Sequence, residues 1–159
     1  MKITEHTQEI KEVEKMIFTA CEVADLLGVA AQQVTNWTVA RPFTINNILK
    51  RGKKAGNRNL YDVKDVLRFM VAQKLWKLGL RGSAIQIIMD HPNTQRDRIW
   101  GIYHLGIVTS SVIQTLPART DLILEVNPPG DWWDAPAYIR VEVKEMKKEL
   151  LSRVLSRLI

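Results

Sequence analysis

The amino-acid sequence predicts an α+β protein, and three observations carry that prediction. Apolar residues recur at helical spacing between residues 19 and 90, strand-like runs separated by Pro and Gly follow Asn93, and a second stretch of helical spacing begins at Val143. The composition, 46% apolar and 25% charged, is that of a folded chain and excludes the disordered and collagen-like classes. A chain of 159 residues has room for one compact domain or two small ones.

A pair of short helices is predicted at the start of the helical region. Thr19 and Glu22 have the spacing of a capping box, in which each side chain accepts a hydrogen bond from a backbone N–H at the start of a helix. Gly28 is placed to end this helix in the left-handed conformation. A second helix begins near Ala31 and must end before Pro42, because proline cannot continue it. The first helix is expected to bury Val23, Leu26 and Leu27.

The small and apolar residues of both helices have the spacing of a helix-turn-helix. Two helices that cross steeply over a short turn need a small residue where they touch, a glycine in the turn and fixed apolar positions around both. All seven positions are filled, by Ala24, Gly28, Val23, Leu27, Val29, Val34 and Trp37. Short helical hairpins that bind no DNA are the alternative reading of this spacing.

The remaining elements of the first 93 residues follow from the same signals. Residues 1–15 are expected to form a polar arm, and residues 43–59, rich in Gly and Asn, a two-stranded ribbon or loop. Asp62 is placed to cap a longer helix that stops at Gly79, and a short helix starts after Ser83. The buried residues of these two helices are expected to be Val63, Val66, Leu67, Met70, Val71, Leu75 and Leu78, then Ile85, Ile88 and Met89.

Past Asn93 the sequence takes on strand character. Strands are predicted over 99–103, 111–114, 122–126 and 138–141, in no readable order. The final amphipathic helix has an apolar stripe too broad for a two-stranded coiled coil, so it either packs within the chain or joins two copies. If it joins two copies, the residues in contact are Met146, Leu150, Val154 and Leu158. The predicted organisation is a helix-turn-helix domain over residues 16–90 and a small α+β dimerisation or sensing domain over residues 91–159.

Positive charge is concentrated in the middle of the chain. The net charge is +6, residues 16–90 hold 11 basic against 5 acidic residues, and no Asp or Glu occurs from Leu26 to Tyr61. Such a local positive field favours a polyanion, most often nucleic acid, as partner. A solvated loop that keeps the protein soluble is the alternative. The cations of this stretch, expected to contact phosphates, are Arg41, Lys50, Arg51, Lys53, Lys54 and Arg58.

The outward face of the second predicted helix carries side chains suited to reading base edges. With Val34 and Trp37 turned inward, that face presents Gln32, Gln33, Thr35 and Asn36, and Thr38 is expected to contact phosphate. Asn and Gln amides bond N6 and N7 of adenine together, and Thr offers a hydroxyl or a methyl group. An ordinary polar helix face is the alternative.

Several motifs between Ile17 and Met89 follow one family pattern. They are FTACEVADLLGV at 18–29, Trp37, GNRNLY at 56–61 before DVL at 65–67, and LWKLGL at 75–80 before Ala84 and Ile85. With these motifs the segment resembles the DNA-binding domain of the MerR family, a winged helix-turn-helix. The resemblance implies that residues 31–38 enter the major groove, that the cations between 50 and 58 form a wing along the phosphates, and that Tyr61 bonds a backbone phosphate.

These observations predict a sequence-specific transcriptional regulator that binds double-stranded DNA as a homodimer, with RNA polymerase as a further partner and no membrane contact. The alternatives are an excisionase-like or architectural DNA-binding accessory factor and a module whose basic loop meets an acidic protein. No catalytic constellation or zinc spacing occurs, so neither enzyme activity nor a cofactor is expected. The single cysteine, Cys21, and the absence of a signal peptide in MKITEHTQEI favour the cytoplasm.

Overall fold

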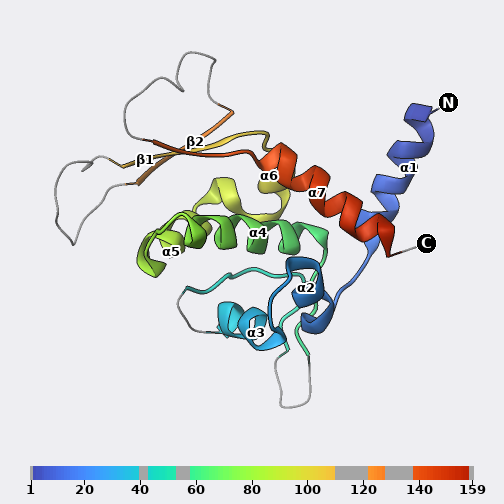
Figure 1. Cartoon of the computed structure of the whole chain (residues 1–159), viewed down its shortest axis with the longest axis horizontal. Helices are drawn as coiled ribbons and strands as arrows, with labels where there is room; N and C mark the ends of the chain where they lie inside the picture. The colour runs from blue at the N-terminus through green and yellow to red at the C-terminus, as the bar shows by residue number, and fades with distance from the viewer. Residues whose placement is uncertain (1, 40–42, 53–57, 110–121, 128–137, 158–159) are drawn as a thin grey trace.

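The computed structural model describes residues 2–39, 43–52, 58–109, 122–127 and 138–157, and this part of the chain has a mixed α+β fold. Helix α4 lies at its centre and contacts α1, α2, α5, α6 and α7, while α2 and α3 lie on the side of α4 opposite the sheet (Figure 1). The elements in chain order are α1 (Lys2–Lys15), α2 (Ala20–Leu27), α3 (Ala31–Val39), α4 (Val63–Lys77), α5 (Gly82–Asp90), the 3-10 helix η1 (Pro92–Thr94), α6 (Arg96–Trp100), β1 (Leu105–Thr109), β2 (Leu122–Val126), β3 (Tyr138–Val141) and α7 (Val143–Ser156).

The two short helices predicted after residue 19 are confirmed as α2 and α3. The backbone N–H of Glu22 donates to Oγ1 of Thr19 at 3.4 Å, and the backbone N–H of Thr19 donates to Oε1 of Glu22 at 3.2 Å, which completes the capping box. Gly28 ends α2 with a φ of 70°, and the N–H of Val29 then bonds the carbonyl of Ala24 at 3.0 Å. The turn of three residues before α3 therefore depends on a left-handed glycine.

Replacing Gly28 with alanine is expected to lower the free energy of unfolding by about 1 kcal/mol, because a Cβ atom is unfavourable at this backbone conformation. Beyond the adjacent residues of the chain, a Cβ atom there would meet no atom within 4 Å, so the cost comes from the local backbone conformation and not from packing against other segments. Urea denaturation measures it, with Gly28→Asn as the control that tolerates the left-handed region better. An alanine variant as stable as the wild type would contradict this account of the turn.

Aromatic packing fixes α3 against the centre of the molecule. The Trp37 ring stacks on Phe43, with ring centroids 5.4 Å apart, and on Phe69 of α4, with centroids 6.0 Å apart. Tyr61 meets the same Phe69 ring edge-on at 5.6 Å. Offset and edge-on aromatic pairs of this kind add to the energy of burial. The position of α3 relative to α4 is therefore set by its buried tryptophan.

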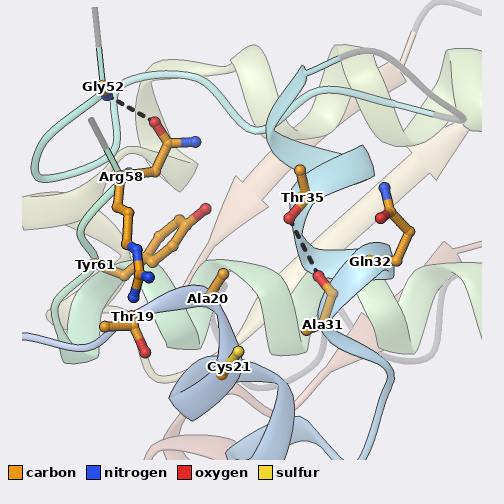
Figure 2. A pocket seen from close by; sticks show the side chains of 10 residues that line it. Thr19, Ala20, Cys21, Ala31, Gln32, Thr35, Gly52, Arg58 and Tyr61 are labelled. Carbon is orange, nitrogen blue, oxygen red and sulfur yellow. Dashed lines mark hydrogen bonds between the residues drawn. The ribbon is translucent and has the colours of Figure 1, made fainter. Parts of the chain in front are cut away.

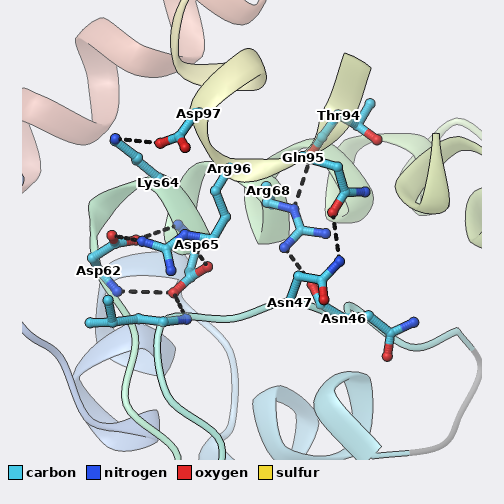
Figure 3. Close-up of polar contacts among 11 residues, drawn as sticks. Asn46, Asn47, Asp62, Lys64, Asp65, Arg68, Thr94, Gln95, Arg96 and Asp97 are labelled. Atoms are coloured by element: carbon cyan, nitrogen blue, oxygen red, sulfur yellow. Dashed lines mark hydrogen bonds and ion pairs between the residues drawn. The ribbon is translucent and has the colours of Figure 1, made fainter. Parts of the chain in front are cut away.

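A buried polar network holds the segment after α3 against α4 (Figure 3). Asp62 caps α4 as predicted, in a reciprocal capping box with Asp65, whose Oδ2 also accepts the backbone N–H of Leu49 at 2.9 Å. Arg68, fully buried, donates to the carbonyls of Asn46 (2.6 Å) and Thr94 (3.0 Å). Arg96 forms ion pairs with both aspartates. These contacts tie residues 46–49 to α4, η1 and α6.

Most of the apolar stripes predicted for α4 and α5 are confirmed, with one exception. Leu78 is exposed because α4 ends at Lys77, so this residue lies past the buried face. Gly79 follows with a φ of 92°, as expected of a helix stop. The buried residues that the stripes predicted are Val63, Val66, Leu67, Met70, Val71, Leu75, Ile85, Ile88 and Met89.

The sheet has the order β2-β1-β3 with antiparallel pairing on both sides of β1. Ile107 lies opposite Leu124 and Ile139, and these residues share the face that packs on the core. The strands predicted over 122–126 and 138–141 are confirmed, and that over 111–114 lies outside the described residues. The strand predicted over 99–103 is wrong: residues 96–100 form α6, because Ile99 is buried in a helical turn against α4.

Two predictions about the ends of the chain are also wrong. Residues 2–15 form helix α1 rather than a polar arm, since Val13 is buried and Glu14 accepts a hydrogen bond from the indole N–H of Trp100 at 2.7 Å. Leu150 and Val154, assigned to dimerisation, are buried within the chain, where α7 packs on α1, α2 and α4. Met146 is half-buried against the same core, and Leu158 lies outside the described residues.

Helix α7 also bonds directly to α2. The Arg153 guanidinium donates to the carbonyl of Leu26, in the last turn of α2, at 2.6 Å and pairs with Glu149. One continuous cluster of buried apolar residues runs from Val13 to Val154, so residues before and after position 91 share a core.

In the described part of the chain, no helix combines the length and apolar character needed to cross a bilayer.

Candidate nucleic-acid interface

A groove of about 520 Å³ lies between the start of α2, the start of α3 and a hairpin formed by residues 50–52 and 58–60 (Figure 2). Lys50 and Leu60 pair across the hairpin through two backbone hydrogen bonds of 3.1 and 2.8 Å. The side chain of Asn59 accepts the N–H of Gly52 at 2.8 Å and closes the base of the hairpin. The residues around the groove are Thr19, Ala20, Cys21, Ala31, Gln32, Thr35, Gly52, Arg58, Asn59 and Tyr61.

The predicted base-reading residues all lie on α3, but they are not equally accessible. Gln32, Thr35 and Asn36 are exposed, whereas Gln33 is half-buried at the flank of the helix. The amide Nε2 of Gln32 donates to Oδ1 of Asn36 at 3.0 Å, and the Thr35 hydroxyl donates to the carbonyl of Ala31 at 3.2 Å. The outward face of α3 therefore presents a linked pair of amides with a hydroxyl beside it.

Val39 is a residue of this face that sequence reasoning missed. Its side chain is 64% exposed, one helical turn beyond Thr35 and Asn36. The period of 3.6 residues places it on the outward face, but an apolar residue is ordinarily assigned to the core. An exposed valine methyl suits contact with the methyl group of thymine, which is the apolar feature of the major groove.

Of the described cations of the hairpin, one lines the groove. Lys50, Arg51 and Arg58 are exposed, and Arg58 lines the groove itself. Arg51 donates through Nη2 to the carbonyl of Thr38 at 2.8 Å, so it also links the hairpin to the last turn of α3. A cation at this end of a helix interacts favourably with the helix dipole. The other predicted phosphate contacts, Arg41, Lys53 and Lys54, lie outside the described residues.

Thr38 and Tyr61, both predicted to contact phosphates, instead lie inside the protein. Each is 0% exposed, and their hydroxyl oxygens are 3.0 Å apart. The Thr38 hydroxyl donates to the carbonyl of Val34 at 2.9 Å, so its oxygen accepts the proton of Tyr61. Tyr61 forms part of the floor of the groove, but its hydroxyl is committed to α3. These residues position α3 and do not reach a phosphate in this conformation.

Among the described residues that line the groove there is no Asp or Glu. The nearest acid along the chain on the α2 side, Glu22, is held by the backbone and hydroxyl of Thr19. Cys21, on the groove wall, is exposed and is the single cysteine of the chain. Among the described residues there is no group of three or more His, Cys, Asp or Glu that would hold a metal ion.

No protein-family model matches the chain, and no curated protein matches it. A function is therefore inferred from the groove and from the face of α3.

Proposed function

We propose that the protein is a sequence-specific regulator of transcription that binds double-stranded DNA as a homodimer. In this proposal α2 and α3 act as a helix-turn-helix, α3 enters the major groove, and the hairpin of residues 50–52 and 58–60 is a basic wing on the phosphates. RNA polymerase is the expected further partner of such a regulator. The fold would be the winged helix-turn-helix that the MerR-like sequence motifs imply.

The observation that carries this proposal is the pairing of an exposed amide face with exposed cations across one groove. Gln32 and Asn36 have the hydrogen-bonding groups that distinguish bases, and Arg58 has the charge that binds a backbone phosphate. The absence of Asp and Glu from Leu26 to Tyr61 supports the same partner, because acids on this surface would be repelled by phosphates.

A second candidate, an excisionase-like or architectural accessory factor, is favoured by one observation. The apolar stripe of α7, which was the predicted joining surface of a dimer, is buried within the chain at Leu150 and Val154. A factor that binds as single copies on direct repeats needs no such surface. A nuclease footprint separates the two candidates, because a dimeric regulator protects a palindrome and an accessory factor protects several direct repeats.

The position of Cys21 gives a direct test of the interface. Duplex DNA bound across the groove is expected to slow the alkylation of Cys21 by a maleimide, measured by mass spectrometry at low ionic strength.

Arg58→Ala is expected to weaken binding to all duplexes alike and to reduce the salt slope of binding by about 1, since one phosphate contact is lost.

Arg98→Ala is the matched control, because Arg98 is an exposed arginine on α6, on the opposite side of α4 from α3. It should leave both the affinity and the salt slope close to those of the wild type. Unchanged alkylation of Cys21 in the presence of saturating duplex, or equal losses for Arg58→Ala and Arg98→Ala, would overturn the proposed interface.

A further inference from the structure

The hydrogen bond between Gln32 and Asn36 joins two exposed amides on the outward face of α3. The two residues are one helical turn apart, and their amide groups meet at 3.0 Å. Neither side chain is covered by the rest of the described chain, so both retain groups that face outward. The bond therefore links the two side chains before any ligand arrives.

The bond leaves a defined set of free groups on the pair. When Gln32 donates to Asn36, the NH₂ of Asn36 and the carbonyl oxygen of Gln32 have no partner within the pair, while the NH₂ of Gln32 keeps its second N–H and the oxygen of Asn36 keeps its second lone pair. If both amides are turned over, Asn36 donates to Gln32, and the free groups become the NH₂ of Gln32 and the oxygen of Asn36. Both arrangements present one amide donor beside one amide acceptor, so the recognition chemistry does not depend on amide orientation.

Adenine is the base whose own major-groove edge complements this set. It offers an acceptor at N7 and a donor at N6, whereas guanine offers two acceptors, cytosine one donor and thymine one acceptor and a methyl group. Guanine would place O6 against the free amide oxygen of the pair, where two acceptors repel each other, and O6 could be bonded only through the remaining N–H of the amide that already donates. The complementarity thus favours adenine over guanine at a single position.

We propose that Gln32 and Asn36 act together as one adenine-reading unit, with the free NH₂ of the pair bonding N7 and its free oxygen accepting from the N6 amino group. This inference rests on the proposed function, and it adds the base that the interface selects. Bound adenine gives a partner to the free group of each amide while the bond between the amides persists, which makes the two residues energetically coupled and not two separate contacts.

The test begins with selection of bound duplexes from a pool with a randomised segment, using the full chain. One position of the selected sequence is expected to be adenine. Replacing that base with 7-deazaadenine, which lacks N7, or with 2-aminopurine, which lacks the N6 amino group, should each weaken binding roughly tenfold or more. Gln32→Ala and Asn36→Ala should each remove this discrimination, and the double variant should lose no more than either single one.

Gln8→Ala is the matched control, because Gln8 carries the same amide and is exposed but lies on α1 and not on α3. It should retain the adenine preference, and circular dichroism should show all variants folded alike. A selected sequence with no position sensitive to the two adenine analogues, or additive losses in the double variant, overturns the adenine-reading unit while the proposed function stands. Failure to bind any duplex in the pool overturns both.

Discussion

Replacing Trp37 with alanine is expected to lower the free energy of unfolding by about 3–5 kcal/mol, which is the usual cost of removing a large buried aromatic side chain. Trp37 is only 2% exposed and stacks on Phe43 and Phe69, so its removal leaves a cavity between α3 and α4. A loss of this size is a large part of the stability of a single domain. Urea denaturation followed by circular dichroism measures it.

The chain supplies its own control in Trp76, which is 45% exposed at the end of α4. Trp76→Ala should cost clearly less than Trp37→Ala, because much of its side chain is already in water. Trp37→Phe should recover part of the loss by refilling the cavity. Equal destabilisation by the two alanine variants would show that Trp37 is not the residue that anchors α3.

The second large effect expected is a dependence of stability on pH that arises from Asp65. Burial raises the pKa of this carboxyl from 3.8 to about 6, and the nearby charge of Asp62 also raises it. The hydrogen bond from the backbone N–H of Leu49 and the charge of Arg96 lower the pKa and offset part of this rise. A carboxyl with a raised pKa binds protons more tightly in the folded state than in the unfolded state. Its contribution therefore increases stability as the pH falls from about 6 towards 3.8 and is lost as the pH rises through 6.

Asp65→Asn isolates this contribution from that of other carboxyl groups. The stability of the wild type relative to Asp65→Asn is expected to improve by about 2 kcal/mol between pH 7.5 and pH 4.5, because the asparagine does not titrate. Denaturation at both pH values gives the difference. Asp97→Asn serves as the comparison, since the bond to Lys64 lowers the pKa of that exposed carboxyl and its effect has the opposite sign. A difference that does not vary with pH would show that Asp65 titrates normally.

The elements that sequence alone predicted well are those set by local hydrogen bonding. The capping residues Thr19 and Asp62 and the left-handed Gly28 act on backbone atoms within a few residues, so their effect is readable from spacing. The apolar stripes of α4 and α5 were likewise predictable, because helix periodicity needs no knowledge of the partner surface. For the candidate site, spacing placed Gln32 and Asn36 outward on α3, as the structure has them.

The features that escaped prediction depend on contacts between distant segments. Residues 96–100 contain Ile99 and Trp100, which favour strand locally, yet packing against α4 makes them helical. Arg68 is charged and would be placed on the surface by composition, but its carbonyl partners at Asn46 and Thr94 come from segments 22 and 26 residues away. The burial of Tyr61 and Thr38 follows from their mutual bond across 23 residues, which no local pattern reveals.

The packing of α7 has a practical consequence for dissecting the molecule. A fragment ending at Asp90 would lack Leu150, Val154 and the guanidinium of Arg153, which together cover the back of α2 and α4. The apolar side chains exposed by the truncation would promote aggregation, and the last carbonyls of α2 would lose a hydrogen-bond donor. Truncation is therefore a poor way to isolate the proposed nucleic-acid surface, because α7, which follows β3 directly in the chain, packs on and bonds to the helix that precedes α3.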